Sequence, residues 1–391
     1  MKKVAIVSCY FQHNYGSMLQ AYATQMALDK LGYDNETIDI SGFRNEIKKS
    51  KIKYFVKTSL TSNILLSKFG MAKAKVIKKL SHGDFGAKSK LRAAEFEKFA
   101  KAKFKLSKKW SSKNELANGC AERYSAVVVG SDQLWLPGNI AADYYTLNFV
   151  PETVNTIAYA TSFGQASLPR DSARKAEVFL KKIKHIGVRE ESGQKLVKQI
   201  ASREVPVVCD PTLLFTGKEW MDIQKEKPIF EDKYIFCYFL GNNPSHREFA
   251  MRLKAEAACK IVALTHLDEY VKSDEGYADF TPYDIDPSDF LNLIRNAEYV
   301  CTDSFHCTVF SILYHKQFFS FRRFASNNKQ STNSRLDTLF NLTGITGRIM
   351  RGDENVKNCV QSPIDYSDID ERLYLIRKEG YAYLKFALED M

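Results

Sequence analysis

The chain has 391 residues, which is too long for one ordinary domain and suits two. Hydrophobic residues make up 45% of it, and 19 Gly and 10 Pro are too few for extensive low complexity, so large cores can form. The net charge of +11 comes from one segment: residues 44–109 hold 20 Lys and Arg against 4 Asp and Glu, while the remainder is slightly acidic.

Targeting and redox signals are missing from the sequence. No apolar run reaches the roughly 18–20 residues of a membrane span, and residues 4–7 are too short a run for a signal peptide. We therefore expect a cytoplasmic protein. The eight Cys form no CxxC pair, so we expect neither a structural zinc site nor a disulfide. The sequence also has no Walker loop, GxGxxG fingerprint or metal-ligand cluster, and we expect no cofactor.

The first half alternates short β-branched runs with helical patterns. Near-continuous apolar strands separated by helices indicate a parallel sheet that is covered on both faces. The expected strands are 3–9, 36–40, 125–129, 156–160, 185–188 and 206–209. The expected helices are 17–31, 171–184 and 190–201. The lysine-rich segment 44–109 interleaves apolar residues with charges and predicts a largely helical insertion.

A charged segment at 216–232 is the expected linker, and a second α/β set follows it. Its expected strands are 234–240, 260–264, 299–302 and 317–321, and its expected helices are 245–258, 287–296, 307–314, 334–343 and 367–388. The sequence thus predicts two Rossmann-like domains, residues 1–220 and 221–391, with the last helix packing back on the first domain.

Polar or charged residues follow nearly every expected strand. Ligands of open parallel sheets bind beyond the carboxyl ends of the strands. One cleft between the two domains would gather all of these residues, so we expect the active site there. The strand-end segments are 11–16, 130–135, 161–164, 189–191, 210–212, 241–242, 303–306 and 322–323.

His306 lies between an expected strand and the helix expected from Cys307. A helix N-terminus favours an anion through its N–H groups and its dipole. Asp303 or Ser304 can cap the same turn. One interpretation is a histidine that binds phosphate and donates a proton; the other is a histidine satisfied by backbone groups in a buried turn. We interpret Cys307 as a packing residue.

Two sets of arginines are candidates for holding an anion. Arg189 follows a strand and suits a phosphate or carboxylate clamp, or else an ion pair with Glu190, Glu191 or Asp210. A second cationic set surrounds the loop 322–335, and we expect only one or two of its members to contact a ligand. These are Arg322, Arg323, Lys329 and Arg335.

Two polar turns suit sugar recognition. Asp132, Gln133 and Trp135 place a carboxylate, an amide and an indole just after a strand, where they could bind and stack on a sugar. The alternative is that Asp132 caps a helix and Trp135 belongs to the core. Residues 14–16, before the first helix, give a tight turn with polar side chains, which is a weak signal alone.

These segments resemble the polysaccharide pyruvyl transferase family. The likeness runs in order over about residues 3–345 and is carried by HNYGSMLQAYA (13–23), GSDQLW (130–135), YATSFG (159–164), VREES (188–192), DPT (210–212) and DSFH (303–306). It implies a glycosyltransferase-B-like fold. It also implies transfer of the pyruvyl group of phosphoenolpyruvate to a sugar, which yields a ketal and inorganic phosphate.

The resemblance implies that the family's histidine is His306, that Arg189 holds the donor, and that Arg335 lies in a matching Asn-Ser-Arg segment. The other site residues are expected from their positions after the strands and from the chemistry of the reaction. The expected catalytic residues are His306, Asp132 and Asp303. His306 could assist the departure of phosphate or act as the acid, and either Asp132 or Asp303 could act as the base. The expected donor-binding residues are Arg189, Arg335, Arg322, Ser304 and Thr308. The expected acceptor-binding residues are His13, Asn14, Tyr15, Gly16, Gln133 and Trp135. Two positions depart from the family's pattern: Ser304 stands where some relatives have arginine, and Cys307 where glycine is usual.

The basic segment 44–109 has several interpretations. It could be a solvated face, or it could bind nucleic acid, although no nucleic-acid-binding module is visible and we expect no such partner. We favour docking to an anionic membrane leaflet from the cytoplasmic side. An acceptor sugar carried on a polyprenyl diphosphate would explain such docking.

Two other functions remain open on the same fold. One is a glycosyltransferase that uses a nucleotide-sugar donor. The other is a non-catalytic family member, which Ser304 and Cys307 favour.

Overall fold

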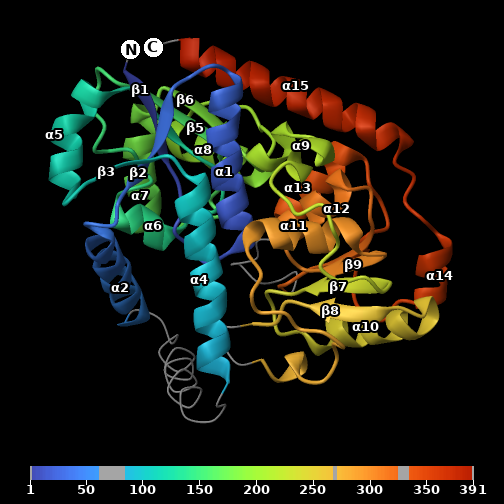
Figure 1. Cartoon of the computed structure of the whole chain (residues 1–391). Helices are drawn as coiled ribbons and strands as arrows, with labels where there is room; N and C mark the ends of the chain where they lie inside the picture. Colours follow the sequence, from blue (N-terminus) through green and yellow to red (C-terminus); the bar gives the residue numbers. More distant parts are fainter. Residues whose placement is uncertain (1, 61–83, 267–270, 325–333, 390–391) are drawn as a thin grey trace.

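The computed structural model describes residues 2–60, 84–266, 271–324 and 334–389 (Figure 1). It contains two parallel β-sheets, each packed between helices, and thereby confirms the predicted class of two α/β domains. The lysine of the second cationic set, Lys329, lies outside the described residues.

The first sheet has six strands in the order β3-β2-β1-β4-β5-β6. Their bounds are β1 (Lys3–Val7), β2 (Asn35–Asp39), β3 (Leu106–Lys109), β4 (Tyr124–Val129), β5 (Asn155–Thr161) and β6 (His185–Val188). The central strands are buried on both faces because successive side chains enter different cores: Val4 and Ile6 pack in one cluster, Ala5 and Val7 in the other. The helices of this half are α1 (Tyr15–Lys30), α5 (Lys113–Arg123), α6 (Pro137–Ala142), α7 (Arg170–Lys182) and α8 (Glu191–Ala201).

The second sheet has five strands in the order β11-β10-β9-β7-β8. Their bounds are β7 (Tyr234–Tyr238), β8 (Lys260–Ala263), β9 (Tyr299–Thr302), β10 (Gln317–Phe321) and β11 (Ile349–Met350). The helices of this half are α10 (Pro244–Ala257), α11 (Pro287–Asn296), α12 (Phe305–Leu313), α13 (Ser334–Thr343) and α14 (Val356–Gln361), with a short 3-10 helix, Lys272–Asp274.

Helix α15 (Ser367–Glu389) leaves the second domain and packs on the first, so that the two chain ends lie close together at the top of Figure 1. The Asn155 side-chain amide donates to the Ala387 carbonyl at 2.7 Å, and the Tyr383 hydroxyl donates to the Ala158 carbonyl at 3.2 Å. Gly380 allows the close approach, since a Cβ there would lie 2.8 Å from the Tyr159 hydroxyl.

The described parts of the basic segment form helix α2 (Arg44–Leu60) and helix α4 (Phe85–Lys103), and the segment ends in the edge strand β3. That strand was not predicted. Helix α4 runs beside the junction of the two domains (Figure 1). Arg92 anchors it to the second domain, donating to the carbonyls of Thr265 at 2.9 Å and Pro282 at 3.0 Å.

Two predicted boundaries were wrong in ways that matter for the cleft. The expected strand 206–209 is reduced to one bridge between Val188 and Val207, because Pro206 has no N–H to donate and Asp210 caps a 3-10 helix, Pro211–Leu214. Helix α12 begins at Phe305 instead of Cys307, which puts His306 inside its first turn. The expected linker contains a short helix, α9 (Gly217–Met221), with a capping box between Thr216 and Glu219.

No helix within the described ranges is both long and apolar enough to cross a membrane.

Candidate active site in the cleft between the two sheets

A cavity of about 360 Å³ opens between the carboxyl ends of the two sheets. Both domains contribute polar side chains to it, which places many strand-end residues around one space. The first domain supplies Asn14, Ser17, Asp132 and Gln133, and the second supplies Ser304, His306, Arg323 and Arg335. Helix α2 of the basic segment completes the wall with Lys51 and Phe55.

His306 bridges the two domains. It is 6% exposed, and its Nε2 lies 3.4 Å from the Asp210 carboxylate of the first domain. Its other ring nitrogen faces the start of α1, where a Cβ on Gly16 would lie only 2.2 Å away. Glycine at position 16 is therefore what lets α1 approach the imidazole, and its role is to make room for His306.

Asp210 is the centre of a buried charge network. Its carboxylate accepts hydrogen bonds from Arg189 at 2.8 Å, from the Ser131 hydroxyl at 2.8 Å and from the Thr212 hydroxyl at 2.7 Å. Burial alone would raise the pKa of Asp210, but His306 and Arg189 outweigh it and hold that pKa well below the usual range. Asp210 is therefore ionised and holds His306 in place.

Arg189 lies beneath the cavity and does not line it. It is 3% exposed, and besides Asp210 it faces the carboxylates of Asp132 at 3.8 Å and Glu190 at 3.9 Å. Burial opposes its charge, yet these three carboxylates raise the pKa of Arg189 above its usual value. Of the two interpretations made from the sequence, the structure shows the ion pair.

Asp132 does line the cavity. Its backbone has a φ of +81°, a conformation that non-glycine residues rarely adopt, and this turns the carboxylate toward α1. The Ser17 hydroxyl donates to it at 2.6 Å. Burial raises its pKa, but Arg189 and His306 more than offset this and lower it. A carboxylate with a lowered pKa is a weak base, so the geometry favours a binding role for Asp132.

Asp303 is occupied by the backbone. Its two carboxylate oxygens accept the N–H groups of Leu240 at 2.6 Å and Gly241 at 2.9 Å, which fixes the loop after β7. It is buried and does not line the cavity. Its predicted role as a base does not fit this arrangement, because both oxygens are already engaged.

Arg335 and Arg323 supply the cationic side of the cavity. Burial, together with the neighbouring charges of Arg189 and Arg323, lowers the pKa of Arg335 to about 9. Arg322 does not line the cavity and pairs with Asp337 at 2.6 Å on an exposed surface, so the structure does not bring it together with the other expected donor-binding residues. The sequence could not separate Arg322 from its neighbour, because both follow β10.

Several other predicted residues lie away from the cavity. Trp135 is fully buried and donates to the Tyr145 carbonyl at 3.0 Å, so it is a core residue and cannot stack on a sugar. Thr308 is also fully buried and bonds to Ser320 at 2.8 Å. His13 and Tyr15 line a neighbouring cavity of about 210 Å³.

The residues of the first turn of α12 have structural explanations. Ser304 is the N-cap of the helix, and its hydroxyl accepts from the Cys307 N–H at 3.4 Å while still lining the cavity. Burial raises the pKa of the Cys307 thiol, which suits the packing role expected for it. The sequence missed Asp210 as a site residue, although its place in the strand-end segment 210–212 was a signal.

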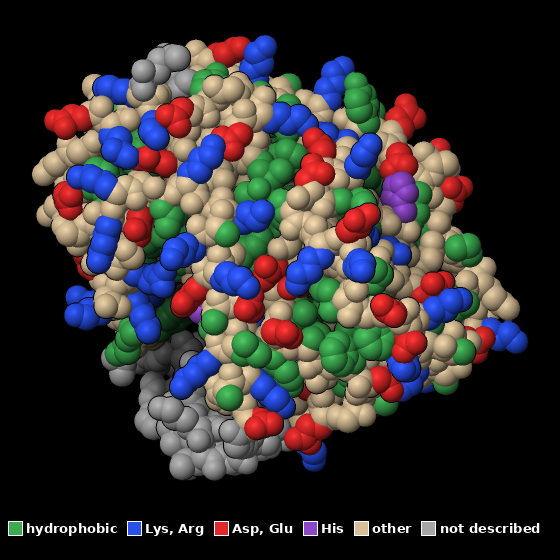
Figure 2. Space-filling model, in the orientation of Figure 1, with side chains coloured by type: hydrophobic (Ala, Val, Ile, Leu, Met, Phe, Trp, Pro, Cys, Tyr) green, Lys and Arg blue, Asp and Glu red, His purple; other side chains and the backbone are tan. Residues whose placement is uncertain are grey.

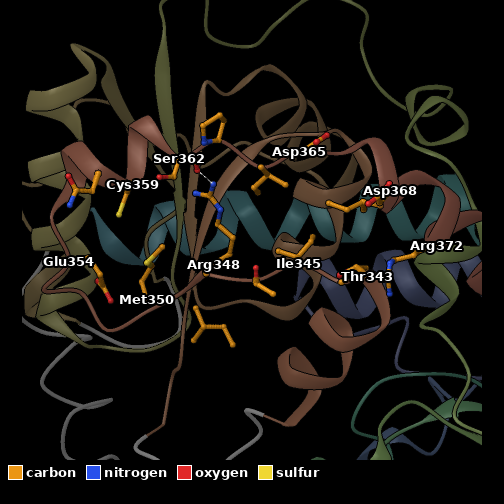
Figure 3. A pocket seen from close by; sticks show the side chains of 18 of the residues that line it. Thr343, Ile345, Arg348, Met350, Glu354, Cys359, Ser362, Asp365, Asp368 and Arg372 are labelled. Carbon is orange, nitrogen blue, oxygen red and sulfur yellow. Dashed lines mark hydrogen bonds between the residues drawn. The ribbon is translucent and has the colours of Figure 1, made fainter.

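A larger cavity of about 770 Å³ lies elsewhere, among residues 343–350 and 354–372 of the second domain. Figure 3 shows Arg348 within it, turned toward Ser362, whose carbonyl accepts a hydrogen bond from Arg348. It contains none of the strand-end residues, so size does not make it the candidate active site. Within the described ranges, no three His, Cys, Asp or Glu side chains are grouped so that they could hold a metal ion.

Replacing Asp210 by Asn should destabilise the protein by about 3–5 kcal/mol at neutral pH, because Arg189 and His306 would lose the buried carboxylate they share. The folded-state pKa of Asp210 is lowered, so this contribution is complete above about pH 5 and declines as the pH falls below about 4. Urea unfolding across this pH range measures it. Asp337→Asn, which breaks the exposed pair with Arg322, is the control and should have little effect. An Asp210→Asn deficit that is absent, or that persists unchanged at pH 3, contradicts the network.

Solved structures that superimpose over the whole chain include two UDP-N-acetylglucosamine 2-epimerases. A putative UDP-N-acetylglucosamine 2-epimerase from Listeria monocytogenes superimposes with a TM-score of 0.54 at 10% identity, covering 100% of this chain and 97% of that chain. The UDP-GlcNAc 2-epimerase from Neisseria meningitidis, bound to UDP-GlcNAc, gives 0.51 at 11% identity over 100% of both chains. At such low identity the likeness shows the fold alone, which is glycosyltransferase-B-like.

Comparison by sequence gives the family. A search among curated proteins found no match. The model of the family described as polysaccharide pyruvyl transferase matches residues 14–323. This range reaches from the cap of α1 to Arg323 at the cavity and includes every strand of the two sheets except β1 and β11. The chain therefore belongs to the polysaccharide pyruvyl transferase family.

Proposed function

We propose that the protein transfers the pyruvyl group of phosphoenolpyruvate to a sugar of a lipid-linked polysaccharide precursor, forming a ketal and inorganic phosphate. The observation that carries this proposal is the cationic side of the cleft cavity. Arg335, Arg323 and His306 surround it, and burial beside other cations lowers the pKa of Arg335 to about 9. A bound anion relieves that unfavourable charge, and phosphoenolpyruvate carries a carboxylate and a phosphate.

The proposed reaction assigns the protons without any further reactant. Two acceptor hydroxyls form bonds to C2 of the donor, and the bond from C2 to the phosphate oxygen breaks. One hydroxyl proton ends on C3, which becomes the methyl group, and the other ends on the departing phosphate. His306 is the proton carrier in this proposal because it lines the cavity with its Nε2 3.4 Å from the Asp210 carboxylate, whereas Asp303 is engaged by backbone N–H groups.

The donor site is testable with a matched pair of arginines. Phosphoenolpyruvate should raise the melting temperature of the wild type by a few degrees, since a ligand that binds only the folded state stabilises it. Arg335→Met should abolish the shift, whereas Arg322→Met, on the exposed pair with Asp337, should keep it. Thermal unfolding with and without ligand measures both. A shift with nucleotide sugars and none with phosphoenolpyruvate would instead support the glycosyltransferase alternative, and no shift with either would support a non-catalytic protein.

The proposal that the acceptor is lipid-linked rests on the exposed face of helix α2. Lys48, Lys49, Ile52, Lys53 and Val56 are all exposed, and their spacing puts them on one side of the helix. Figure 2 shows Lys and Arg side chains gathered at the place of α2, on the left of the view. A helix face that combines lysines with apolar residues suits the surface of an anionic membrane. Since Lys51 and Phe55 of the same helix line the cleft cavity, docking there would bring the active site to the bilayer.

Flotation with anionic liposomes tests this docking. The wild type should float with vesicles that contain phosphatidylglycerol and stay behind with neutral ones. Reversing Lys48, Lys49 and Lys53 to Glu should abolish flotation, because each lysine near an anionic surface contributes about 1 kcal/mol. The same reversal at the exposed Lys227, Lys233 and Lys378, which lie outside the segment, should leave it intact. Equal flotation of the two triple variants would refute docking through α2.

A further inference from the structure

A second cavity adjoins the one that holds His306. It has a volume of about 210 Å³ and lies between the start of α1, helix α4 and the carboxyl ends of β7 and β8. The two cavities share Asn14 and Leu240 in their walls, so they are neighbouring parts of one cleft. Aromatic residues from both domains line the smaller one, among them Tyr15, Phe96 and Tyr238, which belong to one hydrophobic cluster.

One histidine of this second cavity is held in an unusual way. The His266 side chain is only 6% exposed, and its Nδ1 lies 2.7 Å from the Asp274 carboxylate, which also accepts the His266 backbone N–H at 3.0 Å. The other carboxylate oxygen accepts two hydrogen bonds from Arg247, at 2.7 Å and 3.1 Å. Arg247, Asp274 and His266 thus form a fixed chain, with the imidazole at the cavity end.

The second ring nitrogen of His266, Nε2, is not bound by Asp274. Nε2 is buried and makes no well-formed hydrogen bond in the part of the chain that the structure describes, although the imidazole also lies close to the backbone of Leu240. A buried polar atom without a partner costs about 1–3 kcal/mol, so such atoms are rare in native proteins and call for a reason. Asp274 already occupies Nδ1, which leaves Nε2 as the nitrogen that can serve a ligand.

We propose that this second cavity binds one pyranose ring of the acceptor, and that Nε2 of His266 hydrogen-bonds a hydroxyl group of that ring. The volume is below the roughly 300–1,000 Å³ of pockets for drug-sized ligands, which suits a single sugar ring. The aromatic walls offer apolar contact to the ring's C–H faces, and His266 offers the polar group that fixes orientation. The position beside the cationic cavity would bring a hydroxyl of the bound sugar toward the donor.

This inference rests on the proposed function, because it names the acceptor site of the same cleft. It also means that the insertion helix α4, which is anchored to the second domain by Arg92, forms part of the acceptor site. Phe96 of α4 forms part of the cavity wall, and Arg92 ties α4 to the carbonyl of Thr265, the residue before His266. The second domain therefore contributes to acceptor binding as well as to donor binding.

Two substitutions separate the two nitrogens of His266. In His266→Asn, the side-chain amide can keep the contact with Asp274 but has no atom at the place of Nε2. In His266→Gln, the longer side chain can reach the place of Nε2 but loses the contact near Nδ1. His315→Asn is the matched control, since the Nε2 atom of His315 lies 2.8 Å from Asp370 in an exposed pair outside the cleft. The positive φ of His315 also tolerates Asn.

Saturation-transfer NMR with methyl glycosides of glucose, galactose, mannose and N-acetylglucosamine provides the test. At least one glycoside should receive saturation from the wild type and from His315→Asn. His266→Asn should weaken its binding about five- to tenfold, the loss expected for one hydrogen bond, and His266→Gln should weaken it less. Thermal unfolding should show that His266→Asn stays folded. No saturation transfer from any of the four glycosides, or equal affinity in the wild type and His266→Asn, would overturn the inference.

Calorimetry with phosphoenolpyruvate alone keeps this result separate from the proposed function. If phosphoenolpyruvate binds but glycoside binding ignores His266, the sugar subsite is wrong and the donor stands. If glycoside binding depends on His266 but phosphoenolpyruvate does not bind, the subsite stands and the proposed donor is wrong.

Discussion

The contact between His306 and Asp210 is the constraint on which the cleft depends. The histidine comes from the second domain and the carboxylate from the first, and their atoms lie 3.4 Å apart with both side chains buried. A buried carboxylate is costly unless cations and donors surround it, and Arg189, Ser131 and Thr212 supply what His306 alone does not. The same network lowers the pKa of Asp132, so one set of charges fixes both the domain contact and the protonation of the cavity wall.

That fixed junction divides the cleft into two unlike spaces. On one side of Asn14 and Leu240 lie Arg323, Arg335 and His306, which suit a small anion. On the other side lie aromatic walls and the imidazole of His266, which suit a neutral ring. The basic insertion contributes to both, since α2 lines the first space and α4 lines the second. An anionic donor and a neutral acceptor would thus bind side by side, each in the cavity whose chemistry suits it.

The fold could be predicted from the sequence because the patterns that specify strands and helices lie within short segments of the chain. Continuous apolar strands that alternate with helices specify parallel sheets, and the strand-end rule then located Asp132, Gln133 and His306 at one cavity. The sequence did not predict how deeply each of these side chains is buried or in which direction it points. Trp135 follows the same strand as Asp132, but its side chain is buried in the core. This is the alternative to the sugar-stacking interpretation made from the sequence. The partners of His266 come from a different helix and a different turn, so no motif marks them.

The central claim is that His306, held between Gly16 and Asp210, is the group that lets phosphate leave the donor. Phosphate release from phosphoenolpyruvate with a lipid-linked glycan fraction tests it most directly, by comparing the wild type with Gly16→Ala. That variant keeps every polar group but adds a methyl group 2.2 Å from the unmoved imidazole, whereas Gly86→Ala, where a Cβ meets nothing within 4 Å, is the control. We expect release to slow at least about 100-fold in Gly16→Ala, with phosphoenolpyruvate still bound, and to be unchanged in Gly86→Ala. Wild-type release by Gly16→Ala would contradict the account.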